Sequence, residues 1–189
     1  MSKMSSRRMM ALGSVVLVSL AACGDSSTAP GGESELISRV TLTLTPSNGG
    51  TALTTYIDDS DGNGPKAPSA QVAVPALVRG VTYTGTVKFE NRLKTPAEDI
   101  TAEVQSEANE HRVFYTITGG TGVTITTTDV DGQNRPLGLR FLKAVAAGAT
   151  AGATRVLLCH YDRAPKVATA TSCTGETDID VSFAYTIAP

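Results

Sequence analysis

The stretch DIDVSFAYTI, residues 178–187, decides the fold of this chain because polar and apolar side chains alternate along it without a break. Such a two-residue period is typical of a β-strand with one face in a core and the other in water. Shorter alternating stretches occur at 40–45, 81–89 and 123–128, often with threonine at the polar positions. Threonine suits the wet face of a strand because it is both β-branched and polar. The 26 threonines of the chain therefore favour sheet structure.

Further strand-like stretches bring the expected number of strands to about nine, and clusters of Gly, Pro, Asn and Asp separate them. Many short strands at this spacing predict an all-β fold, namely an immunoglobulin-like antiparallel β-sandwich. A small closed barrel is the alternative. The additional candidate strands are 51–58, 70–78, 111–118, 137–146 and 153–161.

One segment departs from the two-residue period and predicts a short helix over about 96–109. Residues 95–98 (TPAE) form a capping-box pattern with proline at the first helical position. Apolar residues then recur every four positions, at Ile100, Val104 and Ala108. The acidic side chains of this segment fall largely on the other faces, where they are solvated or form a docking surface for a basic partner or a cation.

The first 22 residues have the composition of an export signal. Residues 1–8 are basic, and residues 9–22 form an apolar stretch that is too short for a membrane span. The stretch runs into LAAC, residues 20–23, which resembles the lipobox of bacterial lipoproteins. This resemblance implies that Cys23 carries fatty acyl chains, which hold the protein on a membrane. An ordinary signal peptide with a chance cysteine is the alternative.

Cleavage before Cys23 would divide the chain into three parts. These are a signal peptide at 1–22, the lipidated cysteine with a flexible Gly-, Ser- and Pro-rich tether at 23–35, and the β-sandwich domain at 36–189. Gly24 directly follows the cysteine, and bacterial sorting rules then favour the outer over the inner membrane. The expected location is therefore the cell envelope, on a lipid anchor.

The charge balance excludes a nucleic-acid partner. The net charge of the chain is -2, and residues 1–22 hold three of the 16 basic groups and none of the 18 acidic ones. The remaining residues have 13 basic against 18 acidic groups, a net charge of -5, which suits no polyanion. The expected partners are the membrane, through the anchor, and an envelope protein or uptake system.

Cys159 and Cys173 remain as a pair once Cys23 is lipidated. Disulfides persist outside the cytoplasm, so we predict a bridge between these two residues. A loop of about 15 residues closed in this way would gain roughly 3 kcal/mol of stability in the chain-entropy model. A metal-binding or redox pair of thiols is the alternative, but no CxxC spacing supports it.

No sequence motif for catalysis is present. The chain lacks a nucleophile elbow, an HExxH sequence, a P-loop and a dinucleotide fingerprint. Its few carboxylate pairs fall in expected turns or on the expected helix, without the apolar setting that raises a catalytic pKa. The sequence therefore predicts a protein that is not an enzyme and needs no cofactor.

A calcium-binding turn is one of two candidate metal sites. Asp59, Asp61 and Asn63 fit the first half of a calcium loop, D-x-D-x-N-G, but the position of the bidentate glutamate of an EF-hand is Ala70. A weaker calcium turn and a plain strand-to-strand turn both remain, and the backbone freedom of Asp, Asn and Gly favours the plain turn. Residues 129–134 (DVDGQN) repeat this chemistry more weakly.

The chain's two histidines, His111 and His160, are the second candidate metal site. Both are flanked by strand-forming residues, so they would meet if their strands faced each other across the two sheets. With Glu107 or Glu110 as an oxygen ligand, such a pair would bind zinc or copper. The alternative is two separate strand histidines without a ligand.

Most of residues 36–187 resembles a family of small bacterial lipoproteins, and four stretches carry the resemblance. They are 58–65 (DDSDGNGP), 95–100 (TPAEDI), 110–115 (EHRVFY) and 175–183 (GETDIDVSF). Members are often labelled "type 1 periplasmic binding fold superfamily protein", which implies solute binding. That fold has two α/β lobes, which period-two strands and one helix do not build. The resemblance transfers no functional residues.

The leading functional hypothesis is a lipid-anchored, non-catalytic binding or accessory module of the cell envelope. The alternative is a solute- or metal-ion-binding lipoprotein that assists an outer-membrane uptake system.

Overall fold

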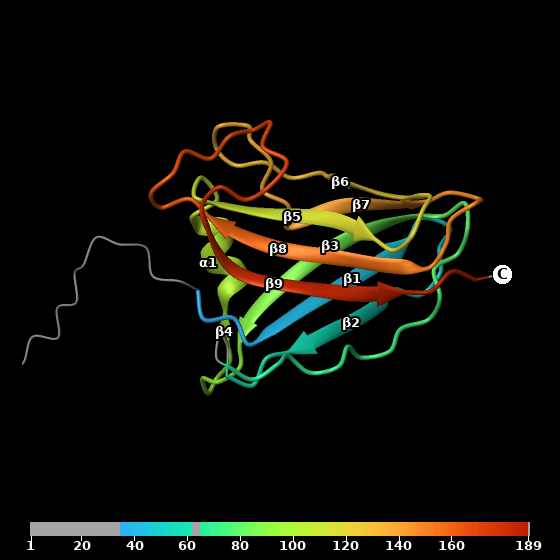
Figure 1. Cartoon of the computed structure of the whole chain (residues 1–189), viewed down its shortest axis with the longest axis horizontal. Helices are drawn as coiled ribbons and strands as arrows, with labels where there is room; N and C mark the ends of the chain where they lie inside the picture. The colour runs from blue at the N-terminus through green and yellow to red at the C-terminus, as the bar shows by residue number, and fades with distance from the viewer. Residues whose placement is uncertain (1–34, 62–64, 189) are drawn as a thin grey trace, which may run out of the picture. The chain divides into compact units, whose positions relative to one another are not determined.

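Two antiparallel β-sheets pack against each other in the computed structural model, which describes residues 35–61 and 65–188 (Figure 1). The predicted signal peptide, the Cys23 anchor and most of the tether lie outside the described residues. Within the described part, no helix has the length and apolar character that a membrane span requires.

The larger sheet has the strand order β2-β1-β3-β7-β6, and the short β4 pairs with the end of β3. All of its paired strands are antiparallel. The strands are β1 (Arg39–Pro46), β2 (Leu53–Asp58), β3 (Thr82–Asn91), β4 (Glu98–Asp99), β6 (Val123–Thr127) and β7 (Arg140–Val145).

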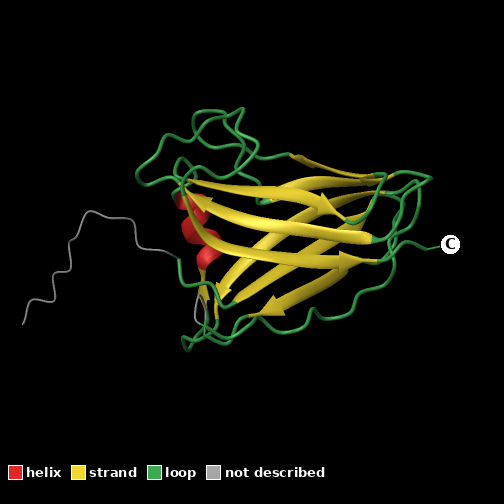
Figure 2. Cartoon of the chain, in the orientation of Figure 1, coloured by secondary structure: helices red, strands yellow, loops and turns green. Residues whose placement is uncertain are grey.

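The smaller sheet has the order β5-β8-β9 and is also antiparallel. Its strands are β5 (His111–Thr118), β8 (Gly152–His160) and β9 (Glu176–Tyr185). The inward side chains of both sheets form one core, as the two-residue period predicts. The prediction of an all-β sandwich with about nine strands and one helix is confirmed (Figure 2).

The helix α1 (Ile100–Ser106) is shorter than predicted and starts four residues later than Pro96. Its N-cap is Asp99, whose side chain accepts a hydrogen bond from the Thr101 backbone N–H. The expected capping box at 95–98 is wrong because Glu98 and Asp99 pair with β3 first. Ile100 and Val104 are buried, so the predicted apolar stripe does face the core.

The stretch 70–78 was expected to be a strand and is not one. It crosses from one sheet to the other, since Val72 donates its backbone N–H to Tyr56 in β2 and Leu77 donates to Thr186 just after β9. Pro75 has no backbone N–H to donate, which is unfavourable in a regular strand. The stretch therefore covers the outer edges of both sheets instead of extending either one.

Cys159 and Cys173 form a disulfide, as predicted, with Cα atoms 5.6 Å apart. The bridge links the end of β8 to the segment that leads into β9. It lies directly beside His160, at the end of the sandwich that α1 covers (Figure 1).

Candidate functional site

The two histidines stack on neighbouring strands of the smaller sheet. His111 opens β5, His160 closes β8, and the antiparallel register places them directly opposite each other. Their ring centroids lie 4.3 Å apart with planes inclined by 20°. The expectation that they would meet across two sheets is therefore wrong, because β5 and β8 are neighbours in one sheet. Both side chains are buried.

Asp178 joins the two histidines because of a β-bulge. In the β8–β9 register Leu158 faces Ile179 and Cys159 faces Thr177, so Asp178 is the extra residue without a partner. A bulge turns the side chain of its extra residue away from strict alternation. Asp178 and Ile179 are consequently both buried, although they are adjacent in sequence. The alternation in 178–187 had placed Asp178 on the outer face, and that placement is wrong.

Glu35 approaches the histidines from the segment before β1. Its carboxylate Oε1 lies 3.8 Å from His111 Nε2, and the residue is only 8% exposed. Glu35, which the sequence places as the last residue of the tether, therefore packs against the folded domain. The composition of the preceding residues does not predict this contact, because a single buried residue before the first strand leaves no periodic pattern in the sequence.

The backbone at the end of α1 fixes the orientation of the His111 ring. The Nδ1 of His111 lies 3.3 Å from the carbonyl oxygen of Glu107, and a carbonyl can only accept a hydrogen bond. The proton is therefore on Nδ1, which leaves the lone pair on Nε2. Nε2 has no hydrogen-bond partner among the described residues and lies 3.9 Å from Asp178 Oδ2.

Burial shifts the pKa values of this cluster toward the neutral form of each side chain. It lowers the pKa of His111 to about 4, so its imidazole is neutral at pH 7. Burial likewise raises the pKa of Asp178 to about 6. For Glu35, burial first and then the nearby Glu103, Asp178 and Glu107 carboxylates raise the pKa to about 7. Neutral imidazoles and carboxylates in close contact are the donor set that a divalent metal ion requires.

The distances within the cluster suit a single bound ion. One ligand atom from each of His111, His160 and Asp178 lies within 4.8 Å of the others, and Glu35 and Glu107 form a second such group with His111. Ligands bound tetrahedrally at about 2.0–2.1 Å lie roughly 3.4 Å from one another. The observed separations of 3.8 and 3.9 Å from His111 Nε2 need a contraction of only about half an ångström to reach this value.

Two further glutamates, Glu107 and Glu110, lie near the histidines with side chains that reach solvent. Glu107 Oε2 lies 4.0 Å from His111 Nδ1, and Glu110 Oε2 lies 4.0 Å from His160 Nε2. These are the two oxygen ligands expected from the sequence, but both side chains are about half exposed. Asp178 and Glu35 are the buried carboxylates, and sequence reasoning missed both of them.

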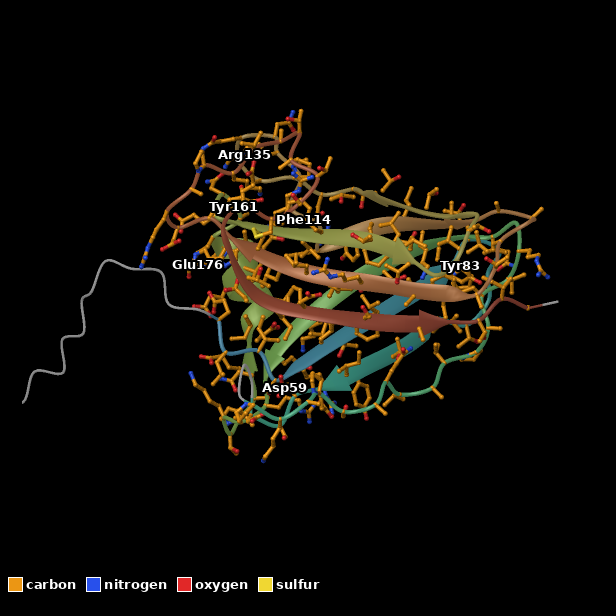
Figure 3. The ribbon with its side chains drawn as sticks, viewed as in Figure 1. Asp59, Tyr83, Phe114, Arg135, Tyr161 and Glu176 are labelled. Atoms are coloured by element: carbon orange, nitrogen blue, oxygen red, sulfur yellow. A yellow bond between two sulfur atoms is a disulfide. The ribbon has the colours of Figure 1, made fainter. Side chains whose placement is uncertain are left out.

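The candidate calcium turn lies elsewhere in the domain. Figure 3 shows Asp59 beside the β1–β2 edge, well apart from Tyr161 and Glu176, which mark the histidine end. Asp59 Oδ1 accepts the backbone N–H of Asp61, as in an ordinary turn. Asn63 lies outside the described residues. No third His, Cys, Asp or Glu ligand joins Asp59 and Asp61 in the described ranges, so calcium binding there stays a prediction.

The weaker turn at 129–134 is held by internal contacts. Asp131 accepts hydrogen bonds from the backbone of Gln133 and Arg135 and from the Arg135 guanidinium. Its Oδ2 also lies 3.0 Å from the ammonium of Lys166, and both side chains are fully buried. These contacts hold the pKa of Asp131 well below its usual range, against the opposing effect of burial. Asp131 is therefore a structural anchor of two loops.

Comparison with known proteins identifies no relative for this chain, because no family model, curated protein or solved structure matches it.

Proposed function

We propose that this protein is a lipid-anchored, non-catalytic module of the cell envelope that binds one divalent transition-metal ion. The ion would be held by His111, His160, Asp178 and Glu35, with Cys23 as the membrane anchor. In this role the module would hold the ion, or pass it on, for a partner such as an envelope uptake system.

The observation that supports metal binding most strongly is the set of buried polar atoms that have no partner. Asp178 is 1% exposed, yet neither of its carboxylate oxygens accepts a hydrogen bond of ordinary geometry from any of the residues that the structure describes. The same holds for Nε2 of the fully buried His111. An unsatisfied buried polar atom costs about 1–3 kcal/mol, and more for a charged group. A cation between these atoms removes that cost.

The donor set favours Zn²⁺ or Cu²⁺ over other ions. Calcium and magnesium take oxygen ligands almost alone, whereas this cluster offers two imidazoles. Cuprous copper prefers thiolates and thioethers, and the nearby Cys159 is already bonded to Cys173. Two imidazole nitrogens with carboxylate oxygens match the ligands of zinc and cupric sites.

A calorimetric titration of the detergent-extracted, chelator-treated protein tests this proposal. Zn²⁺ and Cu²⁺ are expected to bind with one ion per chain, and Ca²⁺ is expected to leave the histidine site empty. Asp178→Asn should weaken binding at least about tenfold, because a carboxylate ligand is lost while the shape is kept.

The matched control is Asp180→Asn, two residues along the same strand. Asp180 faces outward, where it forms an exposed ion pair with Arg155 at 2.6 Å, so its loss should leave the affinity unchanged. Absence of heat with either ion, together with an unchanged melting temperature, would contradict the proposal.

A further inference from the structure

A polar pocket opens on the protein surface next to the buried cluster. Its volume is about 270 Å³, which leaves room for an ion that keeps several of its water molecules. The pocket lies between the segment before β1, the end of β3, β4 and the first turn of α1. Its lining residues are Glu35, Leu36, Asn91, Lys94, Glu98, Ile100 and Glu103.

Glu35 belongs both to this pocket and to the buried cluster. Its carboxylate lines the pocket, while Oε1 lies 3.8 Å from His111 Nε2. A residue that is more than nine-tenths buried and still lines a surface pocket forms the wall between that pocket and the interior. Glu35 therefore connects this surface pocket with the lone pair of His111.

The charges around the pocket attract cations. Glu98 and Glu103 contribute two carboxylates beside Glu35, and Lys94 contributes the single ammonium of the lining. That ammonium is bound to Glu98 Oε2 at 2.7 Å, and both side chains are exposed. A concave surface lined mainly by one sign of charge raises the local concentration of counter-ions and their association rate.

We propose that this pocket is the entrance through which a hydrated divalent metal ion reaches the buried site. Glu98 and Glu103 capture the ion with its water shell, and Glu35 then transfers it to His111, His160 and Asp178. Lys94 opposes capture by its charge. This inference rests on the proposed function, because it concerns the path to the same metal site.

Stopped-flow kinetics separate an entrance from a ligand. The full-length, detergent-extracted protein is mixed with Zn²⁺, and a weak chromophoric zinc chelator reports the fall of free ion. In Glu98→Gln/Glu103→Gln the association rate constant should fall about tenfold at low salt and by less at high salt, with little change in dissociation. Lys94→Gln should have the opposite effect and speed up association.

The control is Asp58→Asn/Asp180→Asn, which changes the net charge equally at two surface ion pairs outside the pocket. Its association rate should equal that of the wild type. If the pocket variant and this control associate equally fast, the ion takes another route and the inference is wrong. If instead the pocket variant dissociates faster at an unchanged association rate, the two glutamates are ligands and the inference is also wrong.

Zinc binding by the wild-type protein, measured apart from the association rates, distinguishes this inference from the proposed function. If the wild-type protein binds no Zn²⁺ at all, the proposed function fails, and the entrance fails with it. If zinc binds and only the rate pattern is absent, the proposed function stands and the entrance alone is refuted.

Discussion

Asp178 Oδ2 lies 3.9 Å from His111 Nε2, although strict alternation along β9 would place Asp178 on the opposite face of the sheet. One bulged residue produces this contact. It gives up a partner in the strand ladder and buries a carboxylate that accepts no hydrogen bond of ordinary geometry within the described part of the chain. Both costs are understandable if the carboxylate is a ligand, since bulges often re-aim side chains at functional sites.

The metal-free protein is expected to become more stable when Asp178 is replaced by Asn. Burial raises the pKa of Asp178 to about 6 from 3.8, so the ionised form is disfavoured in the folded state. The carboxyl is protonated in both states below about pH 3.8, and its cost grows as the pH rises from 3.8 to about 6 and is complete above that value. Asp178→Asn should therefore raise the free energy of unfolding by about 1–3 kcal/mol at pH 7.5.

Urea unfolding of the chelator-treated variant at two pH values measures this effect. The gain should nearly vanish at pH 4, and Asp180→Asn should show no comparable gain at either pH. A loss of stability in Asp178→Asn at pH 7.5 would mean that Asp178 has partners in the metal-free fold, which contradicts the account.

Lys143 is a second buried charge, and its removal is expected to stabilise the domain. Its ammonium donates to Thr154 Oγ1 at 2.8 Å and lies 4.2 Å from the centre of the Tyr185 ring, between the two sheets. Burial lowers its pKa from 10.5 to about 8. The cost of this charge grows as the pH falls from 10.5 through 8 and is complete at pH 7.

Lys143→Met should therefore raise the free energy of unfolding by about 1–3 kcal/mol at pH 7, and by less at pH 10. Lys88→Met is the matched control, because Lys88 is an exposed strand lysine that pairs with Glu90 at the surface. Denaturant unfolding at both pH values measures the difference. Equal effects of the two substitutions would show that the Lys143 charge has no special cost.

The disulfide is expected to stabilise both the fold and the site. Cys159 directly precedes His160, and its partner Cys173 lies 14 residues along the chain. Cys159→Ala/Cys173→Ala should lower the free energy of unfolding by about 3 kcal/mol and weaken Zn²⁺ binding, since His160 loses its fixed position. Thermal unfolding and zinc titration of this variant measure the two effects. An unchanged melting temperature would refute the stabilising role.

The lipid anchor predicts a clear change in cell fractionation. Cys23→Ala removes the only thiol of the LAAC sequence, so the protein should leave the membrane pool almost completely. Globomycin, which blocks the lipoprotein signal peptidase, should leave the signal peptide uncleaved in the wild-type protein. Immunoblots of membrane and soluble fractions report both outcomes, and a Cys23→Ala protein that stays in the membrane would refute the anchor.

The sequence could predict a fold of two packed sheets, but it could not predict which strands are neighbours within each sheet. Alternation at Val40, Leu42 and Leu44 gave the inward face of β1 correctly, because a side-chain period of two is local. The pairing of His111 with His160 depends on which strands become neighbours and in what register. That is decided by contacts about fifty residues apart in the chain, which leave no periodic signal.

The site residues that were missed have the same explanation. Asp178 is a polar residue in a regularly alternating stretch. It turns inward only because it is the extra residue of the bulge, where β9 has one residue more than β8. Glu35 follows a Gly- and Ser-rich stretch, and only the position of the His111 ring makes it a site residue. The helix was placed correctly by its apolar stripe, but its start depended on the pairing of Glu98 and Asp99 with β3.

The most direct test of the central claim is the zinc K-edge X-ray absorption spectrum of the purified, zinc-loaded protein. Zinc bound by His111, His160, Asp178 and Glu35 would show a first shell of nitrogen and oxygen atoms at about 2.0–2.1 Å, with the outer-shell scattering of two imidazole rings. Asp178→Asn should change the oxygen part of this shell and keep the imidazole features. An all-oxygen shell without imidazole scattering, or zinc that is lost on gel filtration, would contradict the account.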